Sequence, residues 1–290
     1  MLPPALDKSI CSLCNGTGWK SFQDGEVERV TRCECWRAKN VARMFKQSHI
    51  PVRYSHCDLD NFQTSSDSLV RALNAGKGFA DSFPVVSKGL LFYGPPGVGK
   101  SHLSAAILRR VIQRVGARAI FCESKEFLRM ARETNNPQSA LSETDVLHPV
   151  LNAELLVFDD LGSERMTDWV HETLNLIVNV RYNEKRPTVF ATNHPPLDAD
   201  PKSMNPTLEE KVGSRIFSRL HEMCEFVEMI TVDHRRLSPD ASPEDFARLD
   251  KKGRRADEIG IPQKSKQARA YLKRTGDGDL KWSGGRAGNK

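Results

Sequence analysis

The sequence predicts an α/β protein in which helices cover both faces of a parallel β-sheet. Three observations lead to this fold class: a strand, glycine-rich loop and helix at residues 89–115, further apolar strands that alternate with helices, and polar side chains where those strands end. Alternation of this kind builds parallel sheets, because each crossover helix returns the chain to the same edge. We expect a three-layer sandwich with five strands, at 90–93, 117–123, 153–158, 187–193 and 226–232.

The first strand runs directly into Gly-Pro-Pro-Gly-Val-Gly-Lys-Ser, and a helical pattern follows. In this context the G-x-x-x-x-G-K-S pattern predicts a phosphate-binding loop, because its glycines let backbone N–H groups surround a phosphate at a helix N-terminus. Lys100 would contact the β- and γ-phosphates, and the Ser101 hydroxyl would bind Mg²⁺. The sequence therefore predicts ATP binding by Gly94, Pro95, Pro96, Gly97, Val98, Gly99, Lys100, Ser101 and His102.

Two carboxylates follow the apolar strand at 153–158, and an amide ends the strand at 187–193. Ligands of parallel sheets bind at the carboxyl ends of the strands. We expect Asp159 to hold Mg²⁺, mostly through water, and Asp160 to orient or deprotonate the attacking water. Asn193 would hydrogen-bond the γ-phosphate or that water.

Two arginines lie four residues apart in a predicted helix at 208–223, so they share one helix face. Such a face is usually only solvated. The alternative is that Arg215 or Arg219 reaches the γ-phosphate of a neighbouring subunit and stabilises the charge of the transition state.

Four cysteines near the N-terminus have the spacing of a metal site. Cys11 and Cys14 precede two glycines, and Cys33 and Cys35 follow a predicted hairpin at 19–31. Four thiolates are the ligand set of a closed, structural Zn²⁺ site. The second pair is tighter than a Cys-x-x-Cys pair, so one of its members could be a spectator, with the site completed by His49, His56 or Cys57.

Charge is distributed unevenly along the chain. The net charge is +6, but residues 235–290 hold 15 Lys and Arg against 8 Asp and Glu, a balance of +7, which leaves −1 for the rest. A basic tail would bind nucleic-acid phosphates without sequence preference. We expect no membrane association, because no apolar run is long enough to span a bilayer. An N-terminus without an apolar signal region, and cysteines at metal spacing, lead us to expect a cytoplasmic protein.

The predicted domain organisation has four parts. Residues 1–36 form a zinc-binding module and residues 37–83 a helical linker. Residues 84–237 form the ATPase domain, and residues 238–290 form a basic, disordered tail that holds one short helix.

Together these motifs resemble the AAA+ helicase loaders of the DnaC/DnaI type and the related IstB transposition helpers. The resemblance runs from about residue 11 to residue 235. It includes the Asp-Asp-Leu-Gly ending of the second motif and the cysteine-rich start. Three further segments carry it: Ile50-Pro51-x-Arg53-Tyr54, Arg181-Tyr182, and Pro187-Thr188 with the Ala-Thr-Asn193 that ends the same strand.

The resemblance implies a role for each motif. The glycine-rich loop would be Walker A, Asp159 and Asp160 Walker B, and Asn193 sensor 1. Arg219, in a Ser-Arg-Leu setting, matches the arginine finger better than its neighbour, and Arg235 is placed like a sensor-2 arginine. Asp160 stands where most AAA+ proteins have glutamate, so we expect slow ATP hydrolysis.

The implied function is ATP-dependent loading of a replicative DNA helicase onto single-stranded DNA. ATP binding would drive self-assembly, and hydrolysis would drive release. One alternative is an IstB-like ATPase that helps a transposase on duplex DNA, although the cysteine-rich start favours helicase docking. Another is a nucleic-acid-binding module that uses ATP only as a conformational switch.

Overall fold

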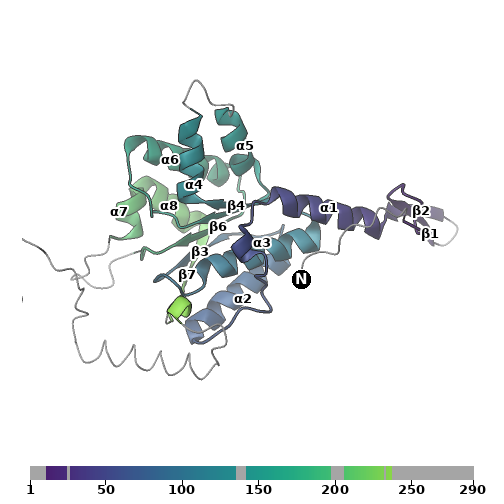
Figure 1. Ribbon diagram of the computed structural model, residues 1–290, viewed down its shortest axis with the longest axis horizontal. Helices are drawn as coiled ribbons and strands as arrows, with labels where there is room; N and C mark the ends of the chain where they lie inside the picture. The colour runs from purple at the N-terminus through teal and green to yellow at the C-terminus, as the bar shows by residue number, and fades with distance from the viewer. Residues whose placement is uncertain (1–10, 25–26, 135–141, 197–205, 232, 237–290) are drawn as a thin grey trace, which may run out of the picture. The chain divides into compact units, whose positions relative to one another are not determined.

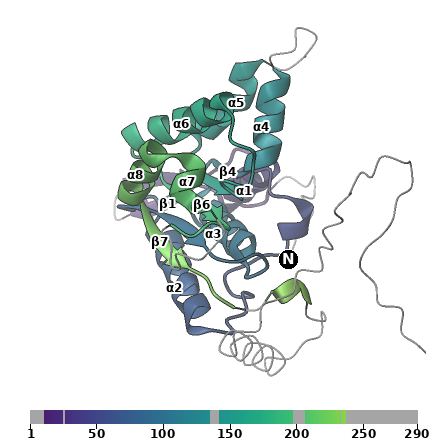
Figure 2. The same ribbon diagram turned by 90° about the vertical axis from the view of Figure 1, so that its left-hand side faces the viewer.

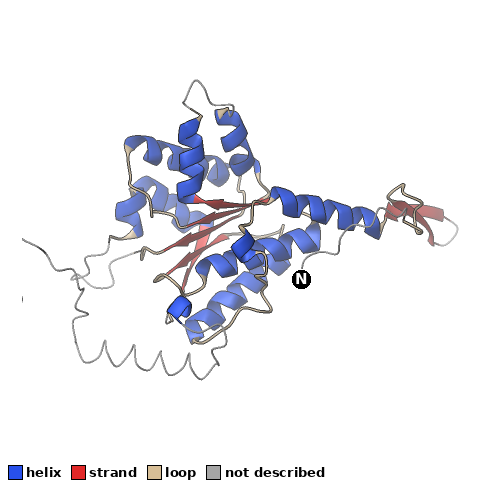
Figure 3. Cartoon of the chain, viewed as in Figure 1, coloured by secondary structure: helices blue, strands red, loops and turns tan. Residues whose placement is uncertain are grey.

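The computed structural model describes residues 11–24, 27–134, 142–196, 206–231 and 233–236. The predicted basic tail and its short helix lie outside the described residues. At the N-terminus, β1 (Trp19–Asp24) and β2 (Val27–Arg32) form the predicted antiparallel hairpin, and α1 (Glu34–Gln47) follows directly (Figure 3).

A five-stranded sheet with the order β4-β5-β6-β3-β7 forms the centre of the larger fold, and all its neighbouring pairs are parallel. This confirms the predicted fold class. The strands are β3 (Gly89–Tyr93), β4 (Ala119–Glu123), β5 (Leu155–Asp159), β6 (Thr188–Thr192) and β7 (Cys224–Glu228). Because the strands are parallel, the ends of β4, β5, β6 and β3 lie along one edge of the sheet.

Helices cover both faces of the sheet (Figures 1 and 2). Successive residues of β3 point to opposite faces: Leu90 and Phe92 join the core beneath α2 and α3, and Leu91 joins the core beneath α4, α6 and α8. The helices are α2 (Asp67–Ser82), α3 (Lys100–Val115), α4 (Ser124–Glu133), α5 (Glu143–Asn152), α6 (Asp168–Asn183), α7 (Leu208–Val212) and α8 (Ser214–Met223), with 3₁₀ turns at Val52–Tyr54 and His234–Arg236. Among the described residues, no helix combines the length and the apolar character that crossing a membrane requires.

Helix α2 lies within the region that the sequence assigned to a linker. Its N-cap is Ser66, whose hydroxyl accepts a hydrogen bond from the Leu69 amide. Leu69 and Phe79 are buried in the same core as Leu103 of α3. The helix therefore belongs to the packed body of the α/β fold.

The prediction of a single helix at 208–223 is wrong, because Gly213 divides this segment into α7 and α8. This glycine has a φ of 82°, and a Cβ there would come within 2.9 Å of the His171 ring nitrogen Nε2. Only glycine adopts this conformation readily in so little space. Both arginines of the predicted helix lie on α8.

Arg181, near the end of α6, is completely buried. Its guanidinium donates hydrogen bonds to the Thr188 hydroxyl at 2.8 Å and to the Pro187 carbonyl at 2.7 Å. Further bonds reach three carbonyls around the end of α5: Val150 and Ala153 at 3.0 Å, and Leu151 at 3.4 Å. Arg181 thus joins the segments that lead into β5 and β6, the two strands that end in the predicted catalytic residues.

Candidate nucleotide-binding site and metal centre

The glycine-rich loop joins β3 to α3, and Lys100 is the first residue of that helix. The Lys100 side chain is buried and folds back over the loop, where Nζ donates to the carbonyl oxygens of Gly94 and Pro95 at 2.7 and 2.8 Å. Burial lowers the pKa of Lys100 to about 8, although Asp159 and Asp160 favour its charged form. The ammonium group therefore lies at the loop, where a phosphate could replace the two carbonyls.

The chain crosses the same loop again after β7. The His234 amide donates to the Gly97 carbonyl at 3.1 Å, and a Cβ on Gly97 would lie only 1.7 Å from an Asp233 carboxylate oxygen. Gly97 also has a φ of 84°, so both its conformation and its surroundings require glycine. This contact brings Arg235, the predicted sensor-2 residue, to the site.

Asp159, Asp160 and Asn193 lie together at the carboxyl edge of the sheet. The Ser101 hydroxyl donates to an Asp159 carboxylate oxygen at 3.0 Å, and the Asn193 amide donates to Asp160 at 2.8 Å. Burial raises the pKa of Asp159 to about 6, despite the hydrogen bond from Ser101. A buried carboxylate that is costly to ionise in isolation is well suited to a cation, and a serine hydroxyl beside it adds a second oxygen ligand for Mg²⁺.

A cavity of about 560 Å³ connects these groups. Most of the predicted residues line it: Pro96, Gly97, Gly99, Lys100, Ser101, His102, Asp159, Asp160, Asn193 and Arg235. Gly94, Pro95 and Val98 belong to the loop but do not line the cavity. Burial, and then the nearby His56, lower the pKa of His102 to about 4, so this ring is neutral at pH 7 and serves as a wall of the cavity.

Part of the cavity wall comes from residues that the sequence did not assign to a nucleotide site. Arg53, Tyr54, His56 and Cys57 line it, and so does Glu123 at the end of β4. Arg53 and Tyr54 belong to the segment at residues 50–54, which is one of those that carry the family resemblance. That resemblance was the signal in the sequence that could have assigned them to the site. The position of His56 and Cys57 also corrects the idea that either could complete the zinc site.

Arg219 does not line the cavity of its own chain. Its Nη1 donates to the Arg215 carbonyl at 3.1 Å, and its guanidinium carbon lies 5.9 Å from the centre of the Tyr182 ring. The Tyr182 hydroxyl in turn donates to Glu222 at 2.7 Å. The arginine is thus held on α8 by a small surface network, outside the cavity of its own chain.

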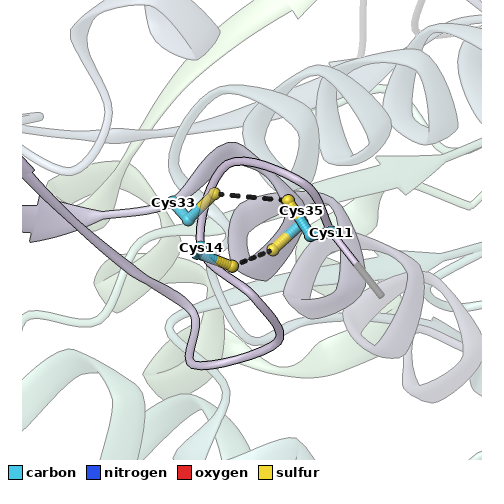
Figure 4. A group of neighbouring side chains, drawn as sticks. All are labelled: Cys11, Cys14, Cys33 and Cys35. Atoms are coloured by element: carbon cyan, nitrogen blue, oxygen red, sulfur yellow. Dashed lines mark hydrogen bonds between the residues drawn. The ribbon is translucent and has the colours of Figure 1, made fainter. Parts of the chain in front are cut away.

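The four predicted zinc ligands lie together (Figure 4). All four sulfur atoms are within 4.8 Å of one another, with 3.8 Å between Cys11 and Cys33 and 3.4 Å between Cys14 and Cys35. A tetrahedral Zn²⁺ with bonds of about 2.3 Å separates its sulfurs by about 3.8 Å, so these positions fit the ion. The Gly18 amide donates to the Cys14 sulfur at 3.3 Å, as expected for a turn that stabilises a thiolate. The arrangement needs neither His49 nor another substitute ligand.

Comparisons with known proteins agree with this architecture. Residues 20–239 match the family model described as IstB-like ATP binding protein. The replicative helicase loader DnaC of Escherichia coli K12 is 28% identical over 180 residues, which cover 62% of this chain and 71% of that protein.

Two solved structures are also similar. A crystal structure of the DnaC helicase loader is 34% identical, with a TM-score of 0.55, and the match covers 62% of this chain and 100% of the solved one. A crystal structure of DnaI is 23% identical, with a TM-score of 0.51, and the match covers 63% of this chain and 95% of that one. The second likeness supports the fold alone.

Proposed function

The chain belongs to the family of IstB-like ATP-binding proteins, and on this premise we propose that it is an ATP-dependent loader of a replicative DNA helicase. The family and its AAA+ relatives imply ATP binding and ATPase activity in general. The loader function rests on one observation, the sequence similarity to DnaC, which is named a replicative helicase loader. The match to a solved DnaC structure covers the whole of that solved chain. Such a partner would place the protein in the cytoplasm.

In this proposal ATP replaces the internal contacts of the phosphate loop. Lys100 would exchange the carbonyls of Gly94 and Pro95 for the β- and γ-phosphate oxygens. The Ser101 hydroxyl and the Asp159 carboxylate would hold Mg²⁺, which when bound neutralises charge on the phosphates. Arg235 and the segment around Tyr54 would close the remaining walls of the cavity around the nucleotide.

Asp160 and Asn193 would then control the attacking water. A hydrogen bond joins the two side chains and both residues line the cavity, so each would hold the other in place beside the γ-phosphate. Asp160 is one methylene shorter than glutamate, so its reach toward a water is reduced. A slow ATPase suits a protein in which ATP acts mainly as a switch.

ATP binding would assemble subunits through Arg219. Arg219 lies outside its own cavity, on a face shared with Arg215, and in this proposal it would contact a neighbour's γ-phosphate. Such an arginine stabilises transition-state charge and makes hydrolysis depend on assembly.

The zinc-binding hairpin would dock the helicase. Several large apolar side chains of this module are exposed, among them Trp19 at 45% and Val30 at 66%. The Arg32 guanidinium stacks over Trp19 at 3.6 Å and over Trp36 at 4.3 Å. Tryptophan and arginine are enriched in protein–protein hot spots. Residues 11–36 carry 3 Lys and Arg against 4 Asp and Glu, a net charge of −1, which favours a protein partner over DNA.

The test is capture of the purified replicative helicase from the same organism by the full-length chain, with ATP and Mg²⁺ or without nucleotide. We expect retention of the helicase, and size-exclusion chromatography should show a larger assembly with ATP. A Trp19→Ala variant should lose the helicase while it keeps ATP binding. Failure to bind the helicase, together with ATP-dependent filaments on duplex DNA, would refute the loader function and favour a transposase helper.

A further inference from the structure

Glu123 is a carboxylate of the nucleotide cavity to which the proposed mechanism assigns no role. Glu123 is the last residue of β4, and in the parallel register it stands beside Asp159 of β5. Its side chain is exposed and lines the same cavity as Asp160 and Asn193. Three strands of the sheet therefore present four polar side chains to one side of the phosphate loop.

A structural role does not account for Glu123. It occupies the N-cap position of α4, where a side chain commonly accepts a backbone hydrogen bond, but its carboxylate makes no such bond. Within the described part of the chain, it also makes no side-chain hydrogen bond and no ion pair. By contrast, Glu126 and Glu133 on the same helix are both paired with Arg129. Glu123 is thus a free carboxylate held at the cavity by its strand.

Asp160 is poorly placed to act alone as the base. Its side chain is shorter than that of Glu123, and the Asn193 amide already donates a hydrogen bond to one of its oxygens. Asp159 is engaged with the Ser101 hydroxyl. The Glu123 side chain is one methylene longer than that of either aspartate. It stands level with Asp159 on the neighbouring strand and lines the same cavity, so its carboxylate can reach a water that the shorter acids cannot.

We propose that Glu123 is the catalytic carboxylate that orients and deprotonates the water attacking the γ-phosphate, while Asp160 and Asn193 position that water. The inference rests on the proposed ATPase function. The water oxygen forms the new bond to the γ-phosphorus, the bond from that phosphorus to the β–γ bridging oxygen breaks, and ADP leaves. The proton of the water passes to the Glu123 carboxylate and from there to solvent. The shorter Walker B acid is thereby supplemented from the neighbouring strand.

The experiment compares steady-state ATP hydrolysis by the full-length wild type with that by Glu123→Gln, Glu123→Asp and the matched control Glu126→Gln, with single-stranded DNA present. Loss of a general base lowers the rate by a factor of about 10² to 10⁴. We expect Glu123→Gln to lower kcat by at least about 100-fold, with KM and the affinity for a non-hydrolysable ATP analogue within about threefold of wild type. Glu123→Asp should recover part of kcat, and Glu126→Gln should keep all of it.

The other outcomes separate this inference from the function it rests on. If wild type and Glu123→Gln hydrolyse ATP equally fast, the inference is wrong and the ATPase function stands. If saturating Mg²⁺ restores kcat in Glu123→Gln, the residue supports the metal and is not the base. If wild type binds the ATP analogue but never hydrolyses ATP, both the catalytic role and the ATPase fail; if it binds no nucleotide, the proposed function itself fails.

Discussion

Replacing Arg181 by methionine is expected to destabilise the ATPase domain strongly. The change removes all five hydrogen bonds of the buried guanidinium. Four of the lost acceptors are carbonyls around the starts of β5 and β6, and a buried acceptor without a partner costs about 1–3 kcal/mol. Burial lowers the pKa of Arg181 to about 9, so removal of this costly charge offsets part of the loss. We expect a net loss of about 3–5 kcal/mol.

Thermal unfolding followed by circular dichroism measures this effect. For a domain of this size each kcal/mol lowers Tm by about 2–4 °C, so Arg181→Met should lower Tm by about 10 °C. Arg181→Lys keeps the charge but concentrates its donors on one nitrogen, so its Tm should lie between those of wild type and Arg181→Met. Arg129→Met, on the exposed face of α4, removes only surface ion pairs and serves as the control. If Arg181→Met unfolds at the same temperature as Arg129→Met, the hydrogen bonds do not hold the strand starts as argued.

Three further predictions concern function. Lys100→Ala should weaken binding of a fluorescent ATP analogue by at least about tenfold, because it removes the phosphate-facing ammonium. Cys33→Ser should lower bound zinc measured by atomic absorption from one ion per chain towards none, and it should abolish helicase capture but not ATP binding; retained zinc would show that another ligand completes the site. The Arg219→Ala variant should bind ATP normally, but it should neither assemble nor hydrolyse ATP. If the arginine acts in trans, mixing this variant with Lys100→Ala should restore hydrolysis. The control Arg215→Ala should behave as wild type.

Much of the ATPase fold could be predicted from the sequence, because its signals are local. The phosphate loop is one continuous segment, and the polar residues that follow β5 and β6 stand directly after the apolar residues of those strands. The hairpin between the cysteine pairs is equally local, because the sequence Asp24-Gly25 is a turn signal and the strands on either side of it pair. These features depend only on neighbours along the chain.

The features that could not be predicted depend on which distant segments become neighbours. Tyr54 and His56 reach the cavity through a turn that precedes the first strand of the sheet by a whole helix. Glu123 can be assigned to the cavity only when β4 is known to lie beside β5. Arg181 near a helix end suggests a contact with the helix dipole, but the packing of α5 against α6 buries it instead. At Gly213 the helical pattern of apolar residues continues on both sides, so its periodicity does not reveal that the helix is interrupted there.

A series of hydrogen bonds runs from the nucleotide site toward the helix pair α7 and α8. Asn193 bonds Asp160, and the next residue, His194, places its two ring nitrogens 3.0 Å from the carbonyls of Gly162 and Pro206. Pro206 precedes α7, whose first amide, that of Leu208, donates to the Pro195 carbonyl at 2.7 Å. A shift of Asn193 towards a γ-phosphate would therefore pull on the start of α7. Because α7 joins α8 through one glycine, the shift would reach the helix that carries Arg219. If the proposed assembly through Arg219 is correct, this hydrogen-bonded segment would couple it to ATP binding.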